Sequence, residues 1–211
     1  MKKIVVAGGG VLGSQIAFQT AYCGFDVTIW LRSQGSIGRT QPKLDSVKKK
    51  YEAAVEKMAS DGDNPRAWSY GLADKENFNK EECLAKIQKA YSGIKIELDL
   101  QKAVADADLI IESMAEDKKQ KIDFYKKLAP FTEEKTIVVT NSSTLLPSEF
   151  AKFTKHPEKY LSLHFANDIW YCNTAEVMAQ PITDKKYFFL FFDYLYLILL
   201  NIYILTYFFY I

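Results

Sequence analysis

The sequence predicts an α/β fold, with a doubly wound and mostly parallel sheet covered by helices on both faces. Short β-branched apolar runs, typical of strands buried on both sides, recur along the chain. Amphipathic segments with helical spacing lie between most of these runs, and a glycine-rich turn follows the first. Residues 1–186 are enough to bury one sizeable core, so we expect a single domain there.

The first strand–helix–strand unit opens the chain. Residues 3–7 (KIVVA) favour a buried strand, and glycines follow at positions 8, 10 and 13. Residues 12–21 place apolar side chains at helical spacing up to a stop at Gly24, and residues 25–31 (FDVTIWL) favour a second strand. This order is that of one βαβ unit.

Residues 34–92 interrupt the alternation, and we interpret them as a helical insertion after the second strand. Within them, residues 45–60 and 80–92 are charged and amphipathic, as surface helices are. A turn-rich stretch around Pro65 joins the two expected helices. The whole segment is longer than a usual strand-to-helix connection, which favours an insertion.

Regular alternation then resumes. Further strands are expected over residues 94–98, 109–112, 136–140, 160–165 and 174–178. Helical segments are expected over residues 101–107, 117–128 and 147–153. The chain therefore alternates strands and helices as a doubly wound sheet requires.

The glycine turn predicts a dinucleotide site. Gly8-x-Gly10-x-x-Gly13 is weak alone, but here it follows a strand and opens a helix inside a βαβ unit. Gly8 permits the tight turn, Gly10 lets a pyrophosphate approach the backbone, and Gly13 allows close packing of helix and strand. The helix, beginning at Val11 and Leu12, offers unpaired N–H groups to the phosphates. We therefore expect a Rossmann-type domain.

The end of the second strand leaves the choice between NAD and NADP open. A carboxylate usually binds the ribose 2′-hydroxyl there. This chain has Trp30, Leu31, Arg32 and Ser33 at that place, and no acid. Arg32, with Ser33 and Arg39 as further candidates, could meet a 2′-phosphate. Equally, Arg32 could be a solvated loop charge.

A histidine and a glutamate form a candidate catalytic pair. His164 lies near the carboxyl end of the strand over residues 160–165, where ligands bind in open α/β sheets. The alternation of the next strand could place Glu176 against its imidazole, which would fix the tautomer of a general base. A histidine near a strand end is also often just hydrogen-bonded within the fold. The other histidine, His156, precedes Pro157 in a polar loop typical of the surface.

Four well-separated motifs carry a family resemblance. They are VAGGGVLG (6–13), ADLIIESMAED with Lys121 (107–121), VVTNSSTLLPSEFA (138–151) and LSLHFAN…AEVM (161–178). In this order they resemble the N-terminal NAD-binding domain of the 3-hydroxyacyl-CoA dehydrogenase family, over residues 3–186. Members of that family continue into an all-helical domain that supplies their homodimer contacts, and nothing in this sequence can play that part.

The resemblance implies reversible oxidation of a 3-hydroxyacyl-CoA by NAD, as in fatty acid metabolism. His164 would remove the hydroxyl proton, Glu176 would orient His164, and Ser143 would hydrogen-bond substrate and cofactor. Further positions that match cofactor or CoA contacts, or are candidates for them, are Glu116, Lys121, Asn141 and Asn167. The plainer alternatives are a helix-capping role for Ser143 and first-turn helix charges for Glu116 and Lys121.

Departures from the family's pattern leave two other functions open. Ala166 and Asp168 stand where Phe and Pro are usual, so the substrate could be a free hydroxy acid or a sugar acid. Without the helical domain, the chain could also be a truncated, non-catalytic remnant that binds a dinucleotide. We expect dinucleotide binding with poor turnover.

The composition excludes several other classes. The 27 Lys and Arg residues nearly balance the 26 Asp and Glu residues, which argues against a nucleic-acid partner. Three isolated cysteines, without CxxC or Cys/His spacing, indicate neither a disulfide framework nor a metal site. The apolar start is broken at once by glycines, so a signal peptide is not expected and the protein is interpreted as cytoplasmic.

Residues 187–211 are abnormal in composition. Twelve aromatic residues fall there, and the segment consists almost wholly of Phe, Tyr, Leu, Ile and Asn. All five have codons built only from A and T, so we favour an out-of-frame translation product that begins where the resemblance ends. A membrane anchor is the alternative, since 25 helical residues could span a bilayer, and a buried core helix is the third possibility.

Overall fold

A computed structural model describes residues 1–198 and 203–207. The strands are β1 (Lys3–Ala7), β2 (Asp26–Trp30), β3 (Lys95–Glu97), β4 (Leu109–Glu112), β5 (Ile137–Thr140), β6 (Tyr160–Phe165), β7 (Thr174–Met178) and β8 (Tyr203–Tyr207). The helices are α1 (Val11–Tyr22), α2 (Gln34–Ser60), α3 (Lys80–Gly93), α4 (Leu100–Val104), α5 (Lys118–Leu128), α6 (Ile169–Cys172) and α7 (Lys185–Ile198). The seven expected strands are confirmed to within one residue at each end.

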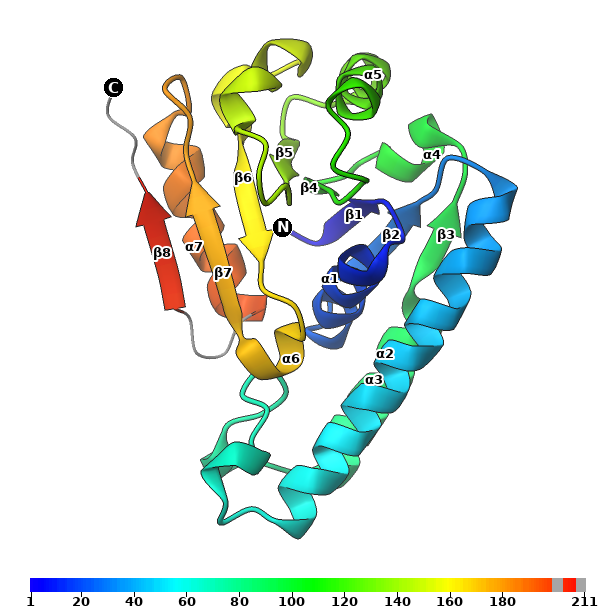
Figure 1. Cartoon of the computed structure of the whole chain (residues 1–211), viewed down its shortest axis with the longest axis vertical. Helices are drawn as coiled ribbons and strands as arrows, with labels where there is room; N and C mark the ends of the chain where they lie inside the picture. The colour runs from blue at the N-terminus through cyan, green and yellow to red at the C-terminus, as the bar shows by residue number, and fades with distance from the viewer. Residues whose placement is uncertain (199–202, 208–211) are drawn as a thin grey trace.

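One eight-stranded sheet runs through the molecule in the order β3-β2-β1-β4-β5-β6-β7-β8 (Figure 1). All pairs from β3 to β6 are parallel. The direction reverses between β6 and β7, which pair antiparallel, and β8 runs parallel to β7. The mostly parallel Rossmann-type sheet is therefore confirmed.

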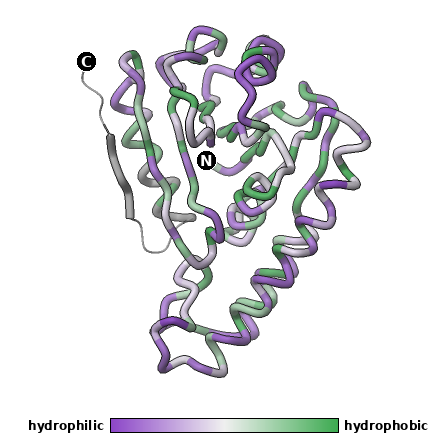
Figure 2. The backbone as a smooth tube through the Cα atoms, viewed as in Figure 1, coloured by the Kyte–Doolittle hydropathy of each residue, from purple (hydrophilic) through white to green (hydrophobic). Residues whose placement is uncertain are grey.

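Helices cover both faces of the sheet, so the fold is doubly wound as predicted. Alternate residues of β1 point to opposite faces: Ile4 and Val6 belong to one core, Val5 and Ala7 to the other. The first core includes residues of α1, α2, α3 and α7, and the second those of α4 and α5. Figure 2 shows the central strands as mainly hydrophobic and the long α2 as mixed.

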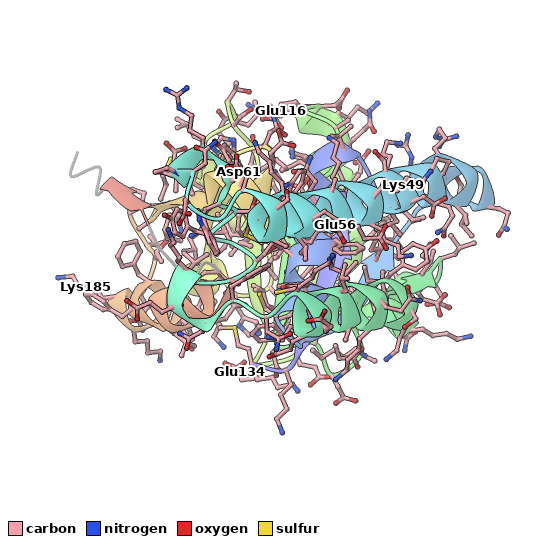
Figure 3. The ribbon with its side chains drawn as sticks, turned by 90° about the horizontal axis from the view of Figure 1, so that it is seen from below. Lys49, Glu56, Asp61, Glu116, Glu134 and Lys185 are labelled. Carbon is pink, nitrogen blue, oxygen red and sulfur yellow. The ribbon has the colours of Figure 1, made fainter. Side chains whose placement is uncertain are left out.

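The insertion after β2 is a helical hairpin. Helix α2 lies beside α3, and exposed side chains such as those of Lys49 and Glu56 project from α2 (Figures 1 and 3). The start expected at residue 45 was wrong, because α2 begins at Gln34 and contains Pro42. Its buried residues recur at helical spacing along its length, and this packing outweighs the lost backbone hydrogen bond at the proline.

The helix expected over residues 147–153 was also wrong. The chain forms only two 3₁₀ turns there, η4 (Pro147–Glu149) and η5 (Ala151–Phe153). Phe150, between the two turns, is fully buried in the core against α5. Short 3₁₀ turns are common in such connections.

Helix α7 crosses residue 186, where the resemblance to the family was expected to end. Phe188, Phe191 and Leu195 are buried in the first core, at the spacing of one helix face. No helix among the described residues is long and apolar enough to cross a membrane. Residues 199–202 and 208–211 lie outside the described part of the chain, and the interpretation of 187–211 as a frameshift product stays a prediction.

A buried ion pair joins β4 to α5. Glu112 and Lys121 have side chains that are 0% and 1% exposed, and Lys121 Nζ donates to both carboxylate oxygens at 2.7 and 2.8 Å. The Tyr125 hydroxyl (3.0 Å) and the Thr140 hydroxyl (2.8 Å) donate to the same carboxylate. Burial, and then the Glu112 charge, raise the pKa of Tyr125, which keeps its hydroxyl protonated as a donor. Charges buried this deeply are tolerated only when they are paired and hydrogen-bonded.

Replacing Lys121 should destabilise the protein strongly. Lys121→Met would leave the Glu112 carboxylate buried without its counter-charge, and we expect a loss of about 3–5 kcal/mol in the free energy of unfolding. Chemical denaturation followed by circular dichroism measures this change. Lys119→Met, on the exposed side of the same helix, is the matched control and should change stability by less than about 0.5 kcal/mol. Equal effects of the two substitutions would contradict the structural role given to the ion pair.

Candidate active site

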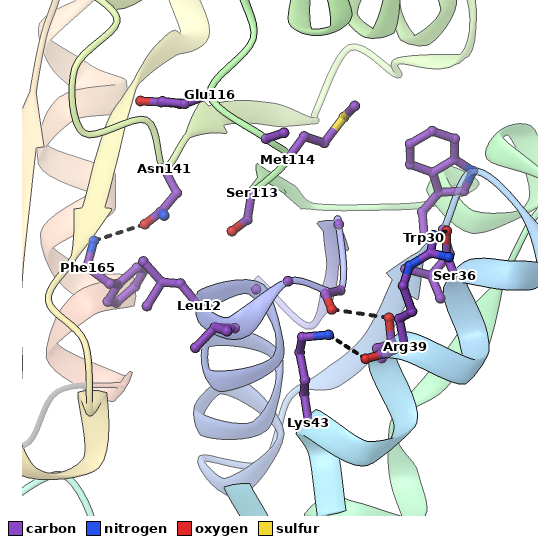
Figure 4. A pocket seen from close by; sticks show the side chains of 18 of the residues that line it. Leu12, Trp30, Ser36, Arg39, Lys43, Ser113, Met114, Glu116, Asn141 and Phe165 are labelled. Atoms are coloured by element: carbon purple, nitrogen blue, oxygen red, sulfur yellow. Dashed lines mark hydrogen bonds between the residues drawn. The ribbon is translucent and has the colours of Figure 1, made fainter. Parts of the chain in front are cut away.

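The main cleft opens at the carboxyl ends of β1 and β4, where the strand order reverses. Ligands of open α/β sheets bind at this switch point. The cavity measures about 820 Å³, and its walls come from the glycine loop, the start of α2 and the ends of β2, β4, β5 and β6 (Figure 4). This volume is in the range of sites for small molecules and cofactors.

The glycine loop fits a dinucleotide. A Cβ on Gly8, whose φ is +120°, would stand 2.5 Å from the Ser113 carbonyl oxygen, and one on Gly13 would stand 2.2 Å from the Gly8 oxygen. A Cβ on Gly10 would meet no protein atom within 4 Å, so the space beside Gly10 is open. Helix α1 begins there at Val11 with no side-chain cap on its N–H groups. These groups are free to bind the phosphates of the dinucleotide.

The change of direction between β6 and β7 brings His164 and Glu176 together. The two residues are directly opposite in the antiparallel register, and His164 Nδ1 lies 2.8 Å from Glu176 Oε2. A carboxylate can only accept, so Nδ1 carries the proton of the neutral ring and Nε2 is left as the basic nitrogen. The two side chains are 27% and 33% exposed, and His164 lines the cleft.

The connection between these two strands is tight. It contains α6 and is bounded by Asp168 and Asn173, both in the left-handed conformation at φ +55° and +49°. Asp and Asn tolerate that conformation better than other residues with a Cβ. Gln15, buried in α1, accepts a hydrogen bond from the Asp168 N–H at 2.8 Å and so fixes the connection to the helix of the glycine loop.

Glu116 organises the loop after β5. Its Oε1 accepts hydrogen bonds from the Ser142 hydroxyl and from the backbone N–H groups of Ser143 (2.9 Å) and Thr144 (3.1 Å). Burial alone would raise the pKa of Glu116, but these donors and the Lys121 ammonium lower it to about 2. With the Thr144 hydroxyl at 3.2 Å, four donors of the loop surround this carboxylate and hold the loop residues in a fixed place beside the cleft.

The other predicted site residues do not all reach the cleft. Ser143, Asn141 and Asn167 line it, and Asn141 Oδ1 accepts from the Phe165 N–H at 3.0 Å. Lys121 does not, because it is 1% exposed and lies 2.7 Å from Glu112 and 3.3 Å from Glu116. Its expected contact with cofactor or CoA is therefore corrected to a supporting position behind the cleft wall.

His156 also differs from its expectation. Its side chain is 15% exposed and lies between Glu134 (3.4 Å) and Glu158 (3.6 Å), so it is half-buried rather than on the surface. It does not line the cleft. Within residues 1–198 and 203–207, no group of three or more His, Cys, Asp or Glu residues could hold a metal ion.

The start of α2 contributes cleft residues that the sequence did not single out. Ser36, Thr40 and Lys43 line the cleft, and the Thr40 hydroxyl donates to the Gly9 carbonyl oxygen at 3.1 Å. Once α2 is known to begin at Gln34, the helical spacing of these residues explains why they share a face.

Comparisons with known proteins agree with this geometry. The family profile described as "3-hydroxyacyl-CoA dehydrogenase, NAD binding domain" matches residues 3–198. The chain is 31% identical over 188 residues to a 3-hydroxybutyryl-CoA dehydrogenase of Clostridioides difficile, covering 88% of this chain and 57% of that protein. It is 28% identical to the mitochondrial hydroxyacyl-coenzyme A dehydrogenase of Sus scrofa, covering 88% and 53%.

Solved structures show the same fold. A diketoreductase superposes with a TM-score of 0.74 at 37% identity, covering 98% of this chain and 64% of that one. The 3-hydroxybutyryl-CoA dehydrogenase of Escherichia coli superposes with a TM-score of 0.73 at 20% identity, covering 97% and 38%. The chain spans about half the length of the curated relatives it matches. The match over residues 3–198 nevertheless extends across nearly the whole chain, which therefore belongs to the 3-hydroxyacyl-CoA dehydrogenase family as its NAD-binding domain.

Proposed function

We propose that the protein oxidises the hydroxyl group of a 3-hydroxyacyl-CoA to a ketone with NAD, and catalyses the reverse reduction. One observation carries the proposal: His164, paired with Glu176 at 2.8 Å, and an open glycine loop line one cleft. A secondary alcohol gives up a proton and a hydride on oxidation, so the site needs a base beside a hydride acceptor. NAD, when bound, supplies that acceptor.

His164 is the proposed base. With Nδ1 hydrogen-bonded to Glu176, Nε2 is available to take the hydroxyl proton of the substrate. The ring becomes positively charged at that moment, and the Glu176 carboxylate stabilises the charge while holding the ring in place. Glu176 thus acts through His164 as a positioning residue.

The loop after β5 completes the proposed site. Ser143 lines the cleft, and its hydroxyl has no hydrogen-bond partner within the described part of the chain, so it is free to donate to the substrate oxygen. Asn141 uses its oxygen for the Phe165 N–H and keeps its amide N–H₂ for a ligand. The hydrogen bonds to Glu116 keep the loop in position without either side chain taking part.

A free dicarbonyl or hydroxy acid is the second candidate substrate. Two observations favour it: the 37% identity to a diketoreductase, and Ala166 and Asp168 in place of the family's usual Phe and Pro beside His164. Comparing NADH oxidation with acetoacetyl-CoA and with free diketo acids separates the two candidates. Activity on free acids without any activity on thioesters would reject the CoA substrate.

The pair of His164 and Glu176 is open to water, with 27% and 33% of the side chains exposed. Active sites gain from excluding water, because electrostatic interactions strengthen when it leaves. We therefore propose that the chain of 211 residues binds the dinucleotide well but turns substrate over slowly. Dinucleotide binding with no turnover on any carbonyl substrate would favour a non-catalytic binding protein instead.

Substitutions in the histidine–glutamate pair test the proposed base. His164→Gln should lower kcat by about 10²–10⁴-fold, because general-base catalysis contributes that much. Glu176→Gln should lower it less and shift the pH profile of kcat/KM to lower pH, because the imidazolium loses its counter-charge and gives up its proton more readily. Spectrophotometric NADH formation measures both. His156→Gln, outside the cleft, is the matched control and should keep the full rate; equal losses in His156→Gln and His164→Gln would contradict the assignment.

The low pKa of Glu116 predicts a specific pH dependence of stability. The carboxyl titrates at about 2 in the folded protein against 4.5 ordinarily, so its contribution is complete above about pH 4.5 and is lost as the pH falls towards 2. Glu116→Gln should therefore lower the thermal unfolding midpoint at pH 7, and the difference from wild type should shrink between pH 4.5 and the acid limit of folding.

Glu76→Gln is the matched control for this measurement. Glu76 is an exposed acid on a surface turn with no hydrogen bond or ion pair from its side chain among the residues described. Glu76→Gln should leave the thermal unfolding midpoint unchanged both at pH 7 and in the acid range below pH 4.5. A Glu116→Gln difference that stays constant from pH 7 into acid would show that the carboxylate charge does not hold the loop.

A further inference from the structure

The residues after β2 lie beside the glycine loop. Ala7 and Trp30 are in register, and the Gly8 N–H donates to the Trp30 carbonyl oxygen at 3.1 Å. In dinucleotide-binding folds, a carboxylate just after this strand accepts hydrogen bonds from the adenine ribose. Here the next residue is Leu31, which is 3% exposed. A Cβ on Gly9 would lie 2.9 Å from Leu31 Cδ2, so an apolar side chain fills the space beneath the loop.

No other acid replaces the missing carboxylate. Glu97, at the end of the neighbouring strand, uses its Oε1 to accept the N–H groups of Leu98 and Asp99, both at 2.8 Å. It does not line the cleft. Among the described residues the only acid that does is Glu116, which lies at the opposite end with Asn141 and Phe165 (Figure 4). A ribose hydroxyl at the β2 end therefore has no carboxylate to bind.

Cations gather at this end instead. Arg32, Arg39 and Lys43 line the cleft there, and none of them forms an ion pair with a carboxylate within the described part of the chain. Their partners are neutral oxygens: Gln120 Oε1 accepts from Arg32 at 2.8 Å, and the Ser36 hydroxyl accepts from Arg39 at 3.0 Å. Three uncompensated positive charges in one end of a cleft attract an anion.

The start of α2 adds donors at the same place. Its N-cap, Ser33, makes no side-chain hydrogen bond to the helix backbone, and the first turn contains no acid. The helix has 27 residues, so its positive N-terminal end is fully developed and is not neutralised locally. Figure 4 shows Ser36, Arg39 and Lys43 on one side of the cleft, near Trp30.

We propose that this end of the cleft holds a 2′-phosphate on the adenine ribose, so that the chain binds NADP(H) in addition to NAD(H), and more tightly. A phosphate can only accept hydrogen bonds, which suits a site built from arginine, lysine and hydroxyl donors. Arginine in particular binds phosphate with two parallel hydrogen bonds. The specificity-determining residues are Arg32, Ser36, Arg39 and Lys43. The inference rests on the dinucleotide site and not on the identity of the carbonyl substrate.

Direct binding of the reduced dinucleotides tests the proposal without any turnover. Titration of the full chain with NADPH and with NADH, followed by tryptophan fluorescence, should give a Kd at least about tenfold lower for NADPH. Added salt should weaken NADPH binding more than NADH binding, since one more phosphate charge is screened. If NADH binds as tightly as NADPH, the proposed 2′-phosphate site is overturned, while the proposed function is not affected. Absence of binding by both would overturn the dinucleotide site and the proposed function with it.

Arginine variants then assign the effect to residues. Arg32→Gln and Arg39→Gln should each raise the Kd for NADPH by about tenfold, and should raise the Kd for NADH several times less. Arg66→Gln, on an exposed turn that does not line the cleft, is the matched control and should alter neither. Adenosine 2′,5′-bisphosphate and 5′-AMP, which lack the nicotinamide, should show the same order of affinities. Equal weakening of NADPH and NADH by both variants would show that the arginines bind the pyrophosphate, and would overturn the proposal.

Discussion

The cleft depends on one buried ion pair. Glu112 ends β4 directly below the cleft and is fully buried with Lys121, so neither charge can exchange its partner for water. The same carboxylate binds hydroxyls from α5 and from β5, and Lys121 reaches on to Glu116 at 3.3 Å. Glu116 in turn carries the loop after β5. A chain of hydrogen bonds therefore runs from the core to the cleft wall. The buried charges of Glu112 and Lys121 fix the position of Glu116, and Glu116 fixes the loop residues that line the cleft.

The single reversal of strand direction, between β6 and β7, positions the other side of the site. Had β7 continued parallel to β6, it would have needed a long crossover, and the tight connection through α6 would not exist. The antiparallel turn instead places Glu176 opposite His164 in the ladder, with the ends of the turn held by Asp168 and Asn173. The pair thus owes its geometry to backbone pairing, which is more rigid than a contact between loops.

The sequence was sufficient for features that follow from local periodicity. The strands from β1 to β7 and the outward-facing pair His164 and Glu176 follow from short apolar runs and their alternation, and the glycine loop follows from its spacing between a strand and a helix. Strand β8 was not expected. Features set by packing over long distances were missed. Helix α2 starts before residue 45 despite Pro42, because its packing against α1 and α3 outweighs the low helix propensity of proline. The sequence did not show this early start, so it did not place Lys43 at the cleft. Lys121 looked like a surface charge because sequence alone does not show which carboxylate meets it in the core.

The glycines of the loop are required for two different reasons, close packing within the protein and open space for a ligand. Alanine at position 8 or 13 would collide with backbone oxygen, so selection for folding alone preserves both glycines. Position 10 is different: its backbone is extended, at φ −68° and ψ −173°, and a Cβ there would meet no protein atom. Gly10 is thus the one glycine of this loop that no clash within the protein requires, and the space beside it is the part of the loop that is left open to a ligand.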